Sequence, residues 1–408
     1  MTKNDDKCVP ALRFKGFNND WAQQELKDLV SFYSGLTYHP EDIKSTGVFV
    51  IRSSNIKHGQ LVNADNVYVD PKSVNSTYVR KKDIIVVVRN GSRNLIGKHA
   101  QVHNDISKSV IGAFMTGIRS NNNDFISALF DSDKFRKEIH KNLGATINQI
   151  TTGEFKKMIF LTPQTLNEKE KIGNLISQIN SLVSLQQRKL QQLKLLKKAM
   201  LQDLFTDKKV PKLRFSGFKE NWIQCKLGEI VKVIGGGTPS TKNPKYWNGQ
   251  INWYSPNEIG SSIFVNSSKK KITSEGLKHS SAKLLPGNKT ILFTSRAGIG
   301  DMAIMTSDGT TNQGFQSWIV DSKDTDIYFL YTLGFKLKRQ SLRKASGSTF
   351  LEISNSEVKQ LKLTVPSIEE QELIGLIVQK MDRLIVIQQK EFNKLESLKK
   401  FLLQNMFI

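Results

Sequence analysis

A glycine-rich run in the first half of the chain has the composition of a phosphate-binding loop, Gly91-Ser-Arg-Asn-Leu-Ile-Gly97-Lys98. Such a loop needs four residues between its glycines and a Ser or Thr after the Lys to hold magnesium. Here five residues separate the glycines, and His99 follows the Lys. The run therefore does not predict a nucleotide site. His99 and His103 have a spacing that metal ligands use, but no Cys or carboxylate cluster accompanies them. We interpret them as solvated or half-buried strand residues.

A second run, Asn243-Pro-Lys-Tyr246, superficially resembles the Asn-Pro-Pro-Tyr with which amino-methyltransferases orient a flipped base amine. Its third residue is Lys245 instead of Pro. The glycines at 235–237 lie too close upstream to leave room for the strand–helix units of a cofactor-binding sheet. No paired carboxylates, nucleophile elbow or metal-ligand cluster stands out elsewhere. The sequence predicts a binding protein with no catalytic residue, no metal and no cofactor of its own.

Basic, amide and aromatic side chains are interleaved on the predicted loops. Arg can bind guanine through two hydrogen bonds and Asn or Gln can bind adenine, whereas Lys meets phosphate as a point charge. The residues that we predict to bind DNA are Arg52, Lys57, Lys81, Lys82, Arg89, Asn90, Arg93, Asn94, Lys98, Lys242, Tyr246, Trp247, Trp253, Asn257, Lys269, Lys270, Lys271, Arg296, Asn312, Gln313 and Gln316.

The overall composition agrees with a polyanion as partner. Lys and Arg number 60 against 37 Asp and Glu, which gives a formal charge of +23 and an isoelectric point near 9.8. The two cysteines, Cys8 and Cys225, cannot form a disulfide framework or a four-ligand zinc site. No signal peptide is visible, and the longest apolar runs are strand-length, far below the ~20 residues that span a bilayer. We expect a soluble cytoplasmic protein that does not enter a membrane.

The elements that must position these residues occur twice. Pro10-Ala-Leu-Arg-Phe-Lys-Gly-Phe17 with Trp21 returns as Pro211-Lys-Leu-Arg-Phe-Ser-Gly-Phe218 with Trp222, and residues 172–205 return as 374–407. A repeat of about two hundred residues is typical of a duplicated domain. The copies diverge between these matches, so we expect two related modules with different targets. The predicted domains are residues 1–163, a helix over 164–206, residues 207–366, and a second helix over 367–408.

Each module has a β-rich, mixed α/β pattern, with Gly, Asn and Asp between short apolar runs. The predicted strands are residues 48–51, 61–69, 84–88, 158–162 and 290–294, and single helices are predicted over 124–141 and 326–342. Arg89 and Arg296 each follow a predicted strand and precede a turn that leads to Ile-Gly. This similar placement suggests a shared DNA-facing role.

The two long helices carry apolar residues at intervals of three or four, without proline, which indicates a coiled-coil seam. We predict that they pair with each other, antiparallel, around a pseudo-twofold axis, with Gln186 and Gln388 fixing the register. The alternative is two separate amphipathic helices, each lying on its own domain. The predicted seam residues are Leu175, Ile179, Leu182, Gln186, Leu193, Ile377, Met381, Leu384, Gln388 and Leu395. The expected fold class is α+β, with two duplicated β-rich domains separated by the helix pair.

These motifs resemble the specificity (S) subunits of type I restriction–modification systems over nearly the whole chain. The resemblance rests on the repeated Pro-x-Leu-Arg-Phe-x-Gly-Phe…Trp box and on the closing Leu-Lys-Lys and Gln-x-x-Phe of each long helix (196–205 and 398–407). It also rests on three runs of the second copy, Gly235-Gly-Gly-Thr-Pro-Ser-Thr241, Thr294-Ser-Arg-Ala-Gly-Ile-Gly300 and Thr311-Asn-Gln-Gly-Phe315. In the first copy, Ile111-Gly-Ala-Phe114 stands in place of Asn-Gln-Gly-Phe, and Ser34-Gly-Leu-Thr37 stands in place of the Gly-Gly-Thr-Pro run.

The resemblance implies two target recognition domains, each binding one half of a split, asymmetric site on double-stranded DNA. The helices would act as spacers that set the gap between the half-sites. The implied partners are two modification subunits, with S-adenosylmethionine and the methyltransferase chemistry, and restriction subunits with ATP-driven translocation and nuclease activity. S-adenosylmethionine, ATP and magnesium are accordingly expected in the partner subunits and not in this chain.

Two alternatives stay open. The chain could be a self-contained or fused DNA adenine methyltransferase, which binding of the cofactor by the isolated chain would support. It could also be a basic coiled-coil scaffold that binds nucleic acid non-specifically, which sequence-independent binding would support.

Overall fold

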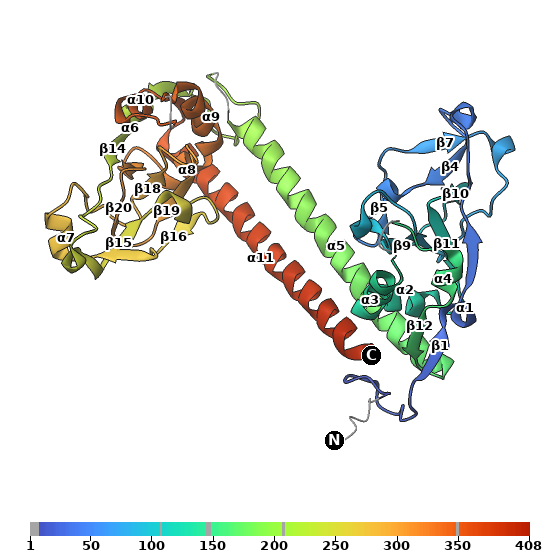
Figure 1. Cartoon of the computed structure of the whole chain (residues 1–408). Coiled ribbons are helices and arrows are strands. Elements are labelled where there is room, and N and C mark those ends of the chain that lie inside the picture. Colours follow the sequence, from blue (N-terminus) through green and yellow to red (C-terminus); the bar gives the residue numbers. More distant parts are fainter. Residues whose placement is uncertain (1–7, 107, 144–147, 206–208, 348–350) are drawn as a thin grey trace, which may run out of the picture. The chain divides into compact units, whose positions relative to one another are not determined.

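The computed structural model describes residues 8–106, 108–143, 148–205, 209–347 and 351–408. The chain forms two compact units, which we call unit 1 (residues 1–188 and 390–408) and unit 2 (residues 189–389). Each unit holds the β-rich domain of one repeat (Figure 1), and both long helices contribute a segment to each unit. None of the described helices combines the length and apolar character needed to cross a bilayer.

Unit 1 is built around a four-stranded sheet of order β2-β11-β8-β9 and a second four-stranded sheet of order β10-β4-β7-β3. Two-stranded pairs β1-β12 and β5-β6 complete it. Its elements are β1 (Ala22–Glu25), α1 (Leu26–Leu29), β2 (Ser31–Ser34), η1 (Pro40–Asp42), β3 (Ile43–Lys44), β4 (Val48–Ile51), η2 (Ser53–Asn55), β5 (Ile56–Lys57), β6 (Gln60–Leu61), β7 (Val67–Val69), η3 (Pro71–Ser73), β8 (Ile84–Val87), η4 (Arg93–Leu95), β9 (His99–Gln101), β10 (Ser109–Ile111), β11 (Met115–Arg119), α2 (Asn123–Asp131), α3 (Asp133–Asn142), α4 (Thr152–Lys156) and β12 (Ile159–Thr162).

Unit 2 repeats this plan with a five-stranded sheet, β14-β21-β18-β19-β16, and a three-stranded sheet, β17-β15-β20. A two-stranded pair, β13-β22, completes it. Its elements are β13 (Ile223–Lys226), α6 (Leu227–Ile230), β14 (Val231–Gly235), η5 (Pro244–Tyr246), β15 (Trp247–Tyr254), η6 (Pro256–Glu258), β16 (Phe264–Val265), β17 (Lys270–Ile272), α7 (Ser274–Lys278), β18 (Thr290–Phe293), β19 (Met302–Met305), β20 (Gly309–Thr311), β21 (Gln316–Val320), α8 (Ile327–Thr332), α9 (Gly334–Lys344), α10 (Asn355–Lys359) and β22 (Lys362–Val365).

The continuous apolar run of β8 follows from a core on each side of its sheet. Ile84 and Val86 belong to the cluster that contains α2 and α3, whereas Ile85 and Val87 belong to a second cluster shared with the other sheet. Successive side chains of a strand point to opposite faces, so a strand buried on both faces is apolar throughout. This burial produces the run that the sequence analysis assigned to a strand.

Both predicted domain helices are interrupted, contrary to the sequence prediction. The segment 124–141 forms α2 and α3, because Ser132 adopts an extended conformation and its hydroxyl caps α3 by accepting a hydrogen bond from the N–H of Phe135. The segment 326–342 forms α8 and α9. The predicted strand over 61–69 is likewise two strands, β6 and β7.

The long helices are α5 (Leu166–Leu204) and α11 (Ile368–Met406). In unit 1, Gln186 Nε2 donates a hydrogen bond to Glu391 Oε2 at 3.2 Å. In unit 2, Lys194 Nζ donates to Gln389 Oε1 at 3.3 Å, and Lys197 forms an ion pair with Asp382. Residue numbers rise along α5 as they fall along α11, so the predicted antiparallel pairing is confirmed within each unit.

The predicted seam residues differ in their solvent exposure. Ile179, Met381 and Gln388 are buried, and Leu175, Gln186, Leu193, Ile377 and Leu395 are half-buried. Leu182 and Leu384, which are equivalent positions of the repeat, are 50% and 48% exposed, so they differ from the predicted seam. Two helices alone cannot surround a side chain at the edge of their contact. Leu190, which belongs to the same three-to-four spacing, is 6% exposed.

Each long helix ends inside the domain of the other repeat. Leu402, Leu403, Met406 and Phe407 at the end of α11 lie in the main core of unit 1. Leu204 and Phe205 at the end of α5 lie in the main core of unit 2. The repeated Gln-x-x-Phe motif therefore supplies an aromatic anchor to the opposite domain.

The repeated Pro-x-Leu-Arg-Phe box holds the start of each long helix. Arg13 binds Glu168 of α5 through two hydrogen bonds of 2.7 and 2.9 Å, and Arg214 binds Glu370 of α11 at 2.9 and 2.8 Å. The carboxylate side chains are only 2% and 1% exposed. In unit 1 the box Trp21 also donates a hydrogen bond to Glu168 at 3.3 Å. From sequence the box indicated the duplication and the family resemblance, and this structural role was not predicted.

Candidate nucleic-acid interface

In unit 2, four loops meet around residues 312–314, between β20 and β21. Three backbone hydrogen bonds join them: Gly237 N–H to Thr311 O at 2.8 Å, Asn312 N–H to Tyr254 O at 3.0 Å, and Ser295 N–H to Gly314 O at 2.7 Å. The loops that follow β14, β15 and β18 are thereby fixed side by side. We call this group of loops the unit 2 loop cluster.

The predicted Gly-Gly-Gly run is needed for this close approach. A Cβ atom on Gly236 would lie 1.9 Å from the backbone oxygen of Asn312, and one on Gly237 would lie 2.2 Å from the backbone nitrogen of Ala282. No side chain can be accommodated at such distances. Gly236 and Gly237 are therefore required by the packing of the cluster.

Several predicted DNA-binding residues come together here. Gln313 is exposed, and its Oε1 accepts a hydrogen bond from Thr238 Oγ1 at 2.6 Å. Arg296 is exposed and forms a 2.8 Å ion pair with Glu352. The other members are Asn312, whose Oδ1 accepts from the N–H of Gly314, Asn257 on η6, and Lys269, whose N–H donates to Glu258 of η6.

Other predicted residues of unit 2 have different surroundings. Trp253 is 7% exposed and donates its indole N–H to Gly237 O, so it supports the cluster from inside. Trp247 packs edge-on against Trp253, and Lys270 lies over Trp247. Gln316 accepts a hydrogen bond from Asn355. Lys242 is exposed, Lys271 is half-buried on β17, and Tyr246 stacks on His279 instead of lining a base pocket.

Unit 1 contains an equivalent loop cluster around residues 112–114. Leu36 N–H donates to Ile111 O at 2.7 Å, Gly112 N–H to Ile51 O at 2.9 Å, and Val88 N–H to Phe114 O at 3.0 Å. These bonds match those of unit 2 one for one. We call this group the unit 1 loop cluster.

This pattern corrects the sequence alignment by one residue. By its backbone bonds Gly112 takes the place of Asn312, and Phe114 takes the place of Gly314. Met115, 2% exposed, then occupies the core position of Phe315, 0% exposed. The sequence had matched Phe114 with Phe315 because both are Phe, whereas Phe114 is 53% exposed.

The two predicted arginines do lie at matching places. Ile150 N–H donates to Val88 O at 2.9 Å, and Ile353 N–H donates to Ser295 O at 3.2 Å. Arg89 and Arg296 are the residues that directly follow these two carbonyls. Their shared DNA-facing role stays a prediction.

Two predicted DNA-binding side chains bind Ser53 in the unit 1 loop cluster. Asn90 Nδ2 donates to Ser53 Oγ and Lys98 Nζ donates to Ser53 O, both at 3.1 Å. Burial, and then the nearby charge of Lys57, lower the pKa of the Lys98 ammonium. Both effects disfavour the protonated form of Lys98.

The remaining predicted residues of unit 1 lie around or away from this cluster. Arg52 forms a 2.6 Å ion pair with Asp65. Lys82 and its neighbour Lys81 precede β8, at the opposite end of that strand from Arg89, and Lys82 pairs with Asp124. Arg93 and Asn94 are exposed on η4, and Arg93 donates to Leu143 O.

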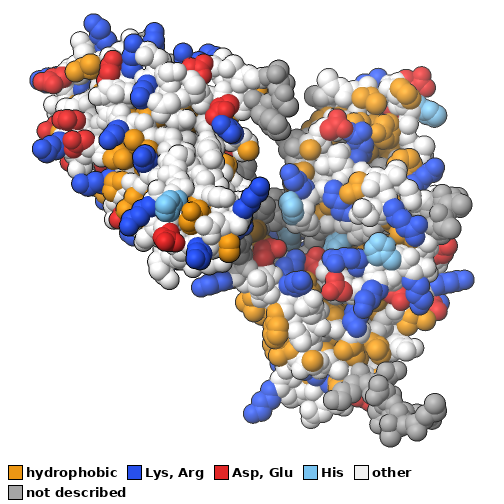
Figure 2. Space-filling view, turned by 60° about the vertical axis from the view of Figure 1, so that its left-hand side comes forward, with side chains coloured by type: hydrophobic (Ala, Val, Ile, Leu, Met, Phe, Trp, Pro, Cys, Tyr) orange, Lys and Arg blue, Asp and Glu red, His pale blue; other side chains and the backbone are white. Residues whose placement is uncertain are grey.

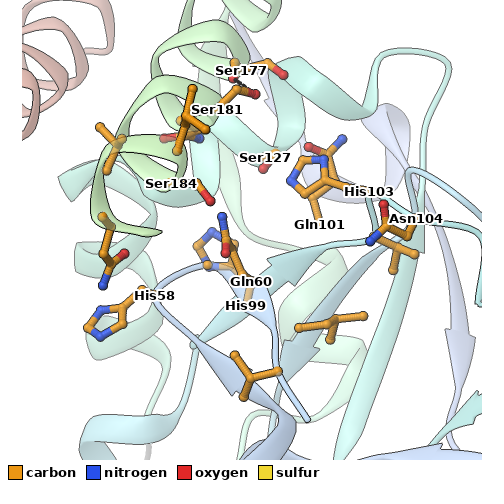
Figure 3. A pocket seen from close by; sticks show the side chains of 18 of the residues that line it. His58, Gln60, His99, Gln101, His103, Asn104, Ser127, Ser177, Ser181 and Ser184 are labelled. Carbon is orange, nitrogen blue, oxygen red and sulfur yellow. Dashed lines mark hydrogen bonds between the residues drawn. The ribbon is translucent and has the colours of Figure 1, made fainter. Parts of the chain in front are cut away.

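A polar cavity of about 880 Å³ lies elsewhere in unit 1. Figure 3 shows His99 and Gln101 of β9, His103 and Asn104 of the next loop, and Ser177, Ser181 and Ser184 of α5 around it. His99 is a half-buried residue of β9, as predicted, whereas His103 is exposed and lies after the strand instead of in it. Among the described residues, no group of three His, Cys, Asp or Glu could hold a metal ion.

Asp131 of α2 connects this cavity to both long helices. Its carboxylate lies 3.3 Å from His99 Nε2, accepts a hydrogen bond from Asn180 of α5 at 3.1 Å, and forms a 2.9 Å ion pair with Lys399 of α11. Burial by itself raises the pKa of Asp131. The hydrogen bonds and charges of His99 and Lys399 outweigh burial and hold this pKa well below its ordinary value.

The pKa of Asp131 predicts an acid-dependent loss of stability. A depressed folded-state pKa contributes stability above the unfolded pKa, ~3.9, and this contribution disappears as the pH falls toward the folded pKa. We expect the stability difference between wild type and Asp131→Asn to be constant from pH 7 to 5 and to shrink below about pH 4. Hydrogen exchange of α2 and β9 amides measures this difference, and a difference that does not change down to pH 3 would contradict the role of the ionised carboxylate.

Comparison with known proteins gives the family. The sequence profile of the type I restriction modification DNA specificity domain matches residues 18–195 and again residues 219–397, one match in each repeat. The chain belongs to this family.

Two curated relatives match part of the chain. The specificity subunit of type I restriction enzyme MjaIX from Methanocaldococcus jannaschii is 36% identical over 192 residues, which are 46% of this chain and 44% of the relative. The EcoR124I/EcoR124II specificity subunit from Escherichia coli is 35% identical over 175 residues, 41% of this chain and 43% of the relative. The matches thus span less than half the length of these relatives.

A solved structure supports the fold over the whole chain. The S subunit of a type I restriction–modification system from M. genitalium superimposes with a TM-score of 0.67, covering 98% of this chain and 99% of that chain. The two sequences are 16% identical, so this likeness concerns the fold alone. The surface charge of this family member also agrees with its composition: Figure 2 shows basic side chains more widely spread than acidic ones over the visible face.

Proposed function

We propose that this chain is the non-catalytic DNA specificity subunit of a type I restriction–modification complex. Each unit would bind one half of a split, asymmetric site through its loop cluster. The observation that carries the proposal is the double match of the DNA specificity domain, with one copy per repeat. Because the loop clusters share a backbone frame but differ in side chains, the two half-sites should differ in sequence.

The long helices offer surfaces for partner subunits. Large apolar side chains that are at least 41% exposed follow both helices: Leu182, Leu185, Leu195 and Leu196 on α5, and Leu373, Leu376, Leu384, Val386, Ile387, Leu398 and Phe401 on α11. Exposed apolar surface of this extent is typical of protein interfaces. We propose two modification subunits as occupants, with restriction subunits joining them. S-adenosylmethionine, ATP and magnesium would belong to those subunits.

The proposal is tested by methylome sequencing of a host that lacks this gene and is then given it with a cognate modification subunit. A split, asymmetric methylation motif that depends on this chain is expected. Exchange of residues 22–160 for those of a relative should change one half of the motif only. A stable complex that methylates no motif would contradict the proposal and favour a scaffold.

Arg296 provides a test at one residue. If its guanidinium binds a base edge, Arg296→Ala should weaken binding to the cognate site by about 1–3 kcal/mol and leave non-specific binding nearly unchanged. Titration of cognate and scrambled duplexes with the purified complex measures both affinities. An equal loss on both duplexes would instead make Arg296 a phosphate contact. Glu352→Gln is a useful companion, because it releases Arg296 from its ion pair and should not weaken cognate binding.

A further inference from the structure

The loop clusters differ at three consecutive equivalent positions. Unit 2 has Asn312 and Gln313, two amide side chains, followed by Gly314, which is buried. Unit 1 has Gly112 and Ala113, which offer no amide, followed by Phe114, which is 53% exposed. Unit 1 therefore lacks the amide groups of unit 2 and presents an aromatic ring instead.

The loop that packs against residue 314 in unit 2, or against residue 114 in unit 1, also differs between the units. In unit 2 a Cβ atom on Gly314 would lie 2.8 Å from Cγ of Pro256, so Pro256 excludes a side chain there. In unit 1 the equivalent loop follows Ile51, whose carbonyl accepts from Gly112 as that of Tyr254 accepts from Asn312. Counting from these carbonyls, the position of Pro256 is taken by Ser53, a smaller residue. The side chain of Phe114 therefore lies at a position where Pro256 leaves no room for a side chain in unit 2.

The ring of Phe114 also packs against the cationic side chain of Arg89. The guanidinium carbon of Arg89 lies 5.0 Å from the ring centroid, a cation–π arrangement. Within the described parts of the chain Arg89 has no ion pair, whereas Arg296 is paired with Glu352. Arg89 is therefore held by the ring with its hydrogen-bonding edge available to a ligand.

We propose that Phe114 and Arg89 together form the base-reading element of unit 1, and that they recognise a thymine next to a guanine in the major groove. The inference rests on the proposed DNA-binding function and adds the bases involved. A guanidinium binds guanine O6 and N7 through two hydrogen bonds, and a Phe ring contacts the C5 methyl group of thymine. Neighbouring base pairs are 3.4 Å apart along the helix axis. Because the two groups lie only 5.0 Å apart, the bases that they contact should be neighbours in the sequence.

The experiment starts with selection of duplexes from a random library by the full-length chain with a cognate modification subunit. The half-site that Arg296→Ala leaves intact is assigned to unit 1. Within it, each thymine is replaced by deoxyuridine, which lacks the methyl group, and each guanine by 7-deazaguanine, which lacks N7. Wild type should lose about 4-fold in affinity at one thymine, the worth of one methyl group, and about 10-fold at the neighbouring guanine.

Variants decide whether these two residues are responsible. Phe114→Ala should bind the thymine and deoxyuridine duplexes equally, and Arg89→Met, which has no hydrogen-bond donor in its side chain, should bind the guanine and 7-deazaguanine duplexes equally. Tyr78→Ala, which removes another exposed aromatic ring of unit 1, should keep the wild-type pattern. A unit 1 half-site without a thymine–guanine step, or a Phe114→Ala variant as sensitive to deoxyuridine as wild type, would overturn the inference. Selection of no motif by wild type would instead overturn the proposed function itself.

Discussion

Phe407→Ala should destabilise unit 1 by about 3–5 kcal/mol, although residue 407 belongs to the second repeat. The Phe407 ring is 2% exposed and lies 6.3 Å from the ring of Trp21 and 5.9 Å from that of Phe125, measured between centroids. Its removal leaves a cavity bounded by two rigid aromatic rings, which cannot collapse readily. Native-state hydrogen exchange of the amides in β8 and α2 measures the loss.

Phe401→Ala is the matched control. Phe401 lies on α11, six residues before Phe407, but is 53% exposed, so its truncation should change exchange in unit 1 by less than about 0.5 kcal/mol. The amides of unit 2 should be unaffected by Phe407→Ala. Equal effects of the two substitutions, or a loss confined to α11, would show that the end of α11 does not stabilise the unit 1 core.

The reciprocal insertion of helix ends explains why the repeated motifs stand where they do. The Pro-x-Leu-Arg-Phe box of each repeat binds the start of its own helix, and Gln-x-x-Phe at the other end of that helix fills the opposite domain. Each domain therefore depends on both repeats. If recognition requires a fixed gap between half-sites, this dependence on both helix ends is the property that a rigid spacer needs.

The long helices were predictable because their signal is local. Apolar residues at intervals of three or four over 39 residues indicate a helix whatever its neighbours are, and buried strands such as β8 are apolar throughout. The break at Ser132 was less visible, because a hydroxyl cap inside an amphipathic stretch does not change the apolar spacing. Sequence spacing described α2 and α3 as one helix for this reason.

The loop clusters could be located from sequence, but their register could not. Matching Phe114 to Phe315 followed residue identity, whereas the backbone bonds pair Phe114 with Gly314. The error arose because the core position is apolar in both units and Met115 fills it as well as Phe does. The role of Phe114 became visible only once its exposure was known. Similarly, Trp253 was predicted to bind DNA because of its residue type, but it is buried by contacts that the sequence does not reveal.

Arg214→Ala should destabilise unit 2 by about 3–5 kcal/mol, the cost of leaving a buried carboxylate without its partner. Glu370 is 1% exposed at its side chain, and both of its oxygens accept hydrogen bonds from Arg214. Without Arg214, the first turn of α11 would have to distort to expose the Glu370 carboxylate to water, or the carboxylate would have to take up a proton. Hydrogen exchange of β18 and α8 amides measures the effect, and Arg339→Ala, which removes an exposed arginine of unit 2, serves as control.

The equivalent substitution in unit 1 sharpens the test. In Arg13→Ala, Glu168 keeps the hydrogen bond from the indole N–H of Trp21, whereas the indole N–H of Trp222 makes no such bond in unit 2. We therefore expect unit 1 to lose about 1 kcal/mol less from Arg13→Ala than unit 2 loses from Arg214→Ala. Equal losses would mean that the buried charge is compensated by the amino-terminal turn of each helix instead of by the box. The repeated Arg would then act through packing of its stem, and Arg214→Met should restore most of the lost stability.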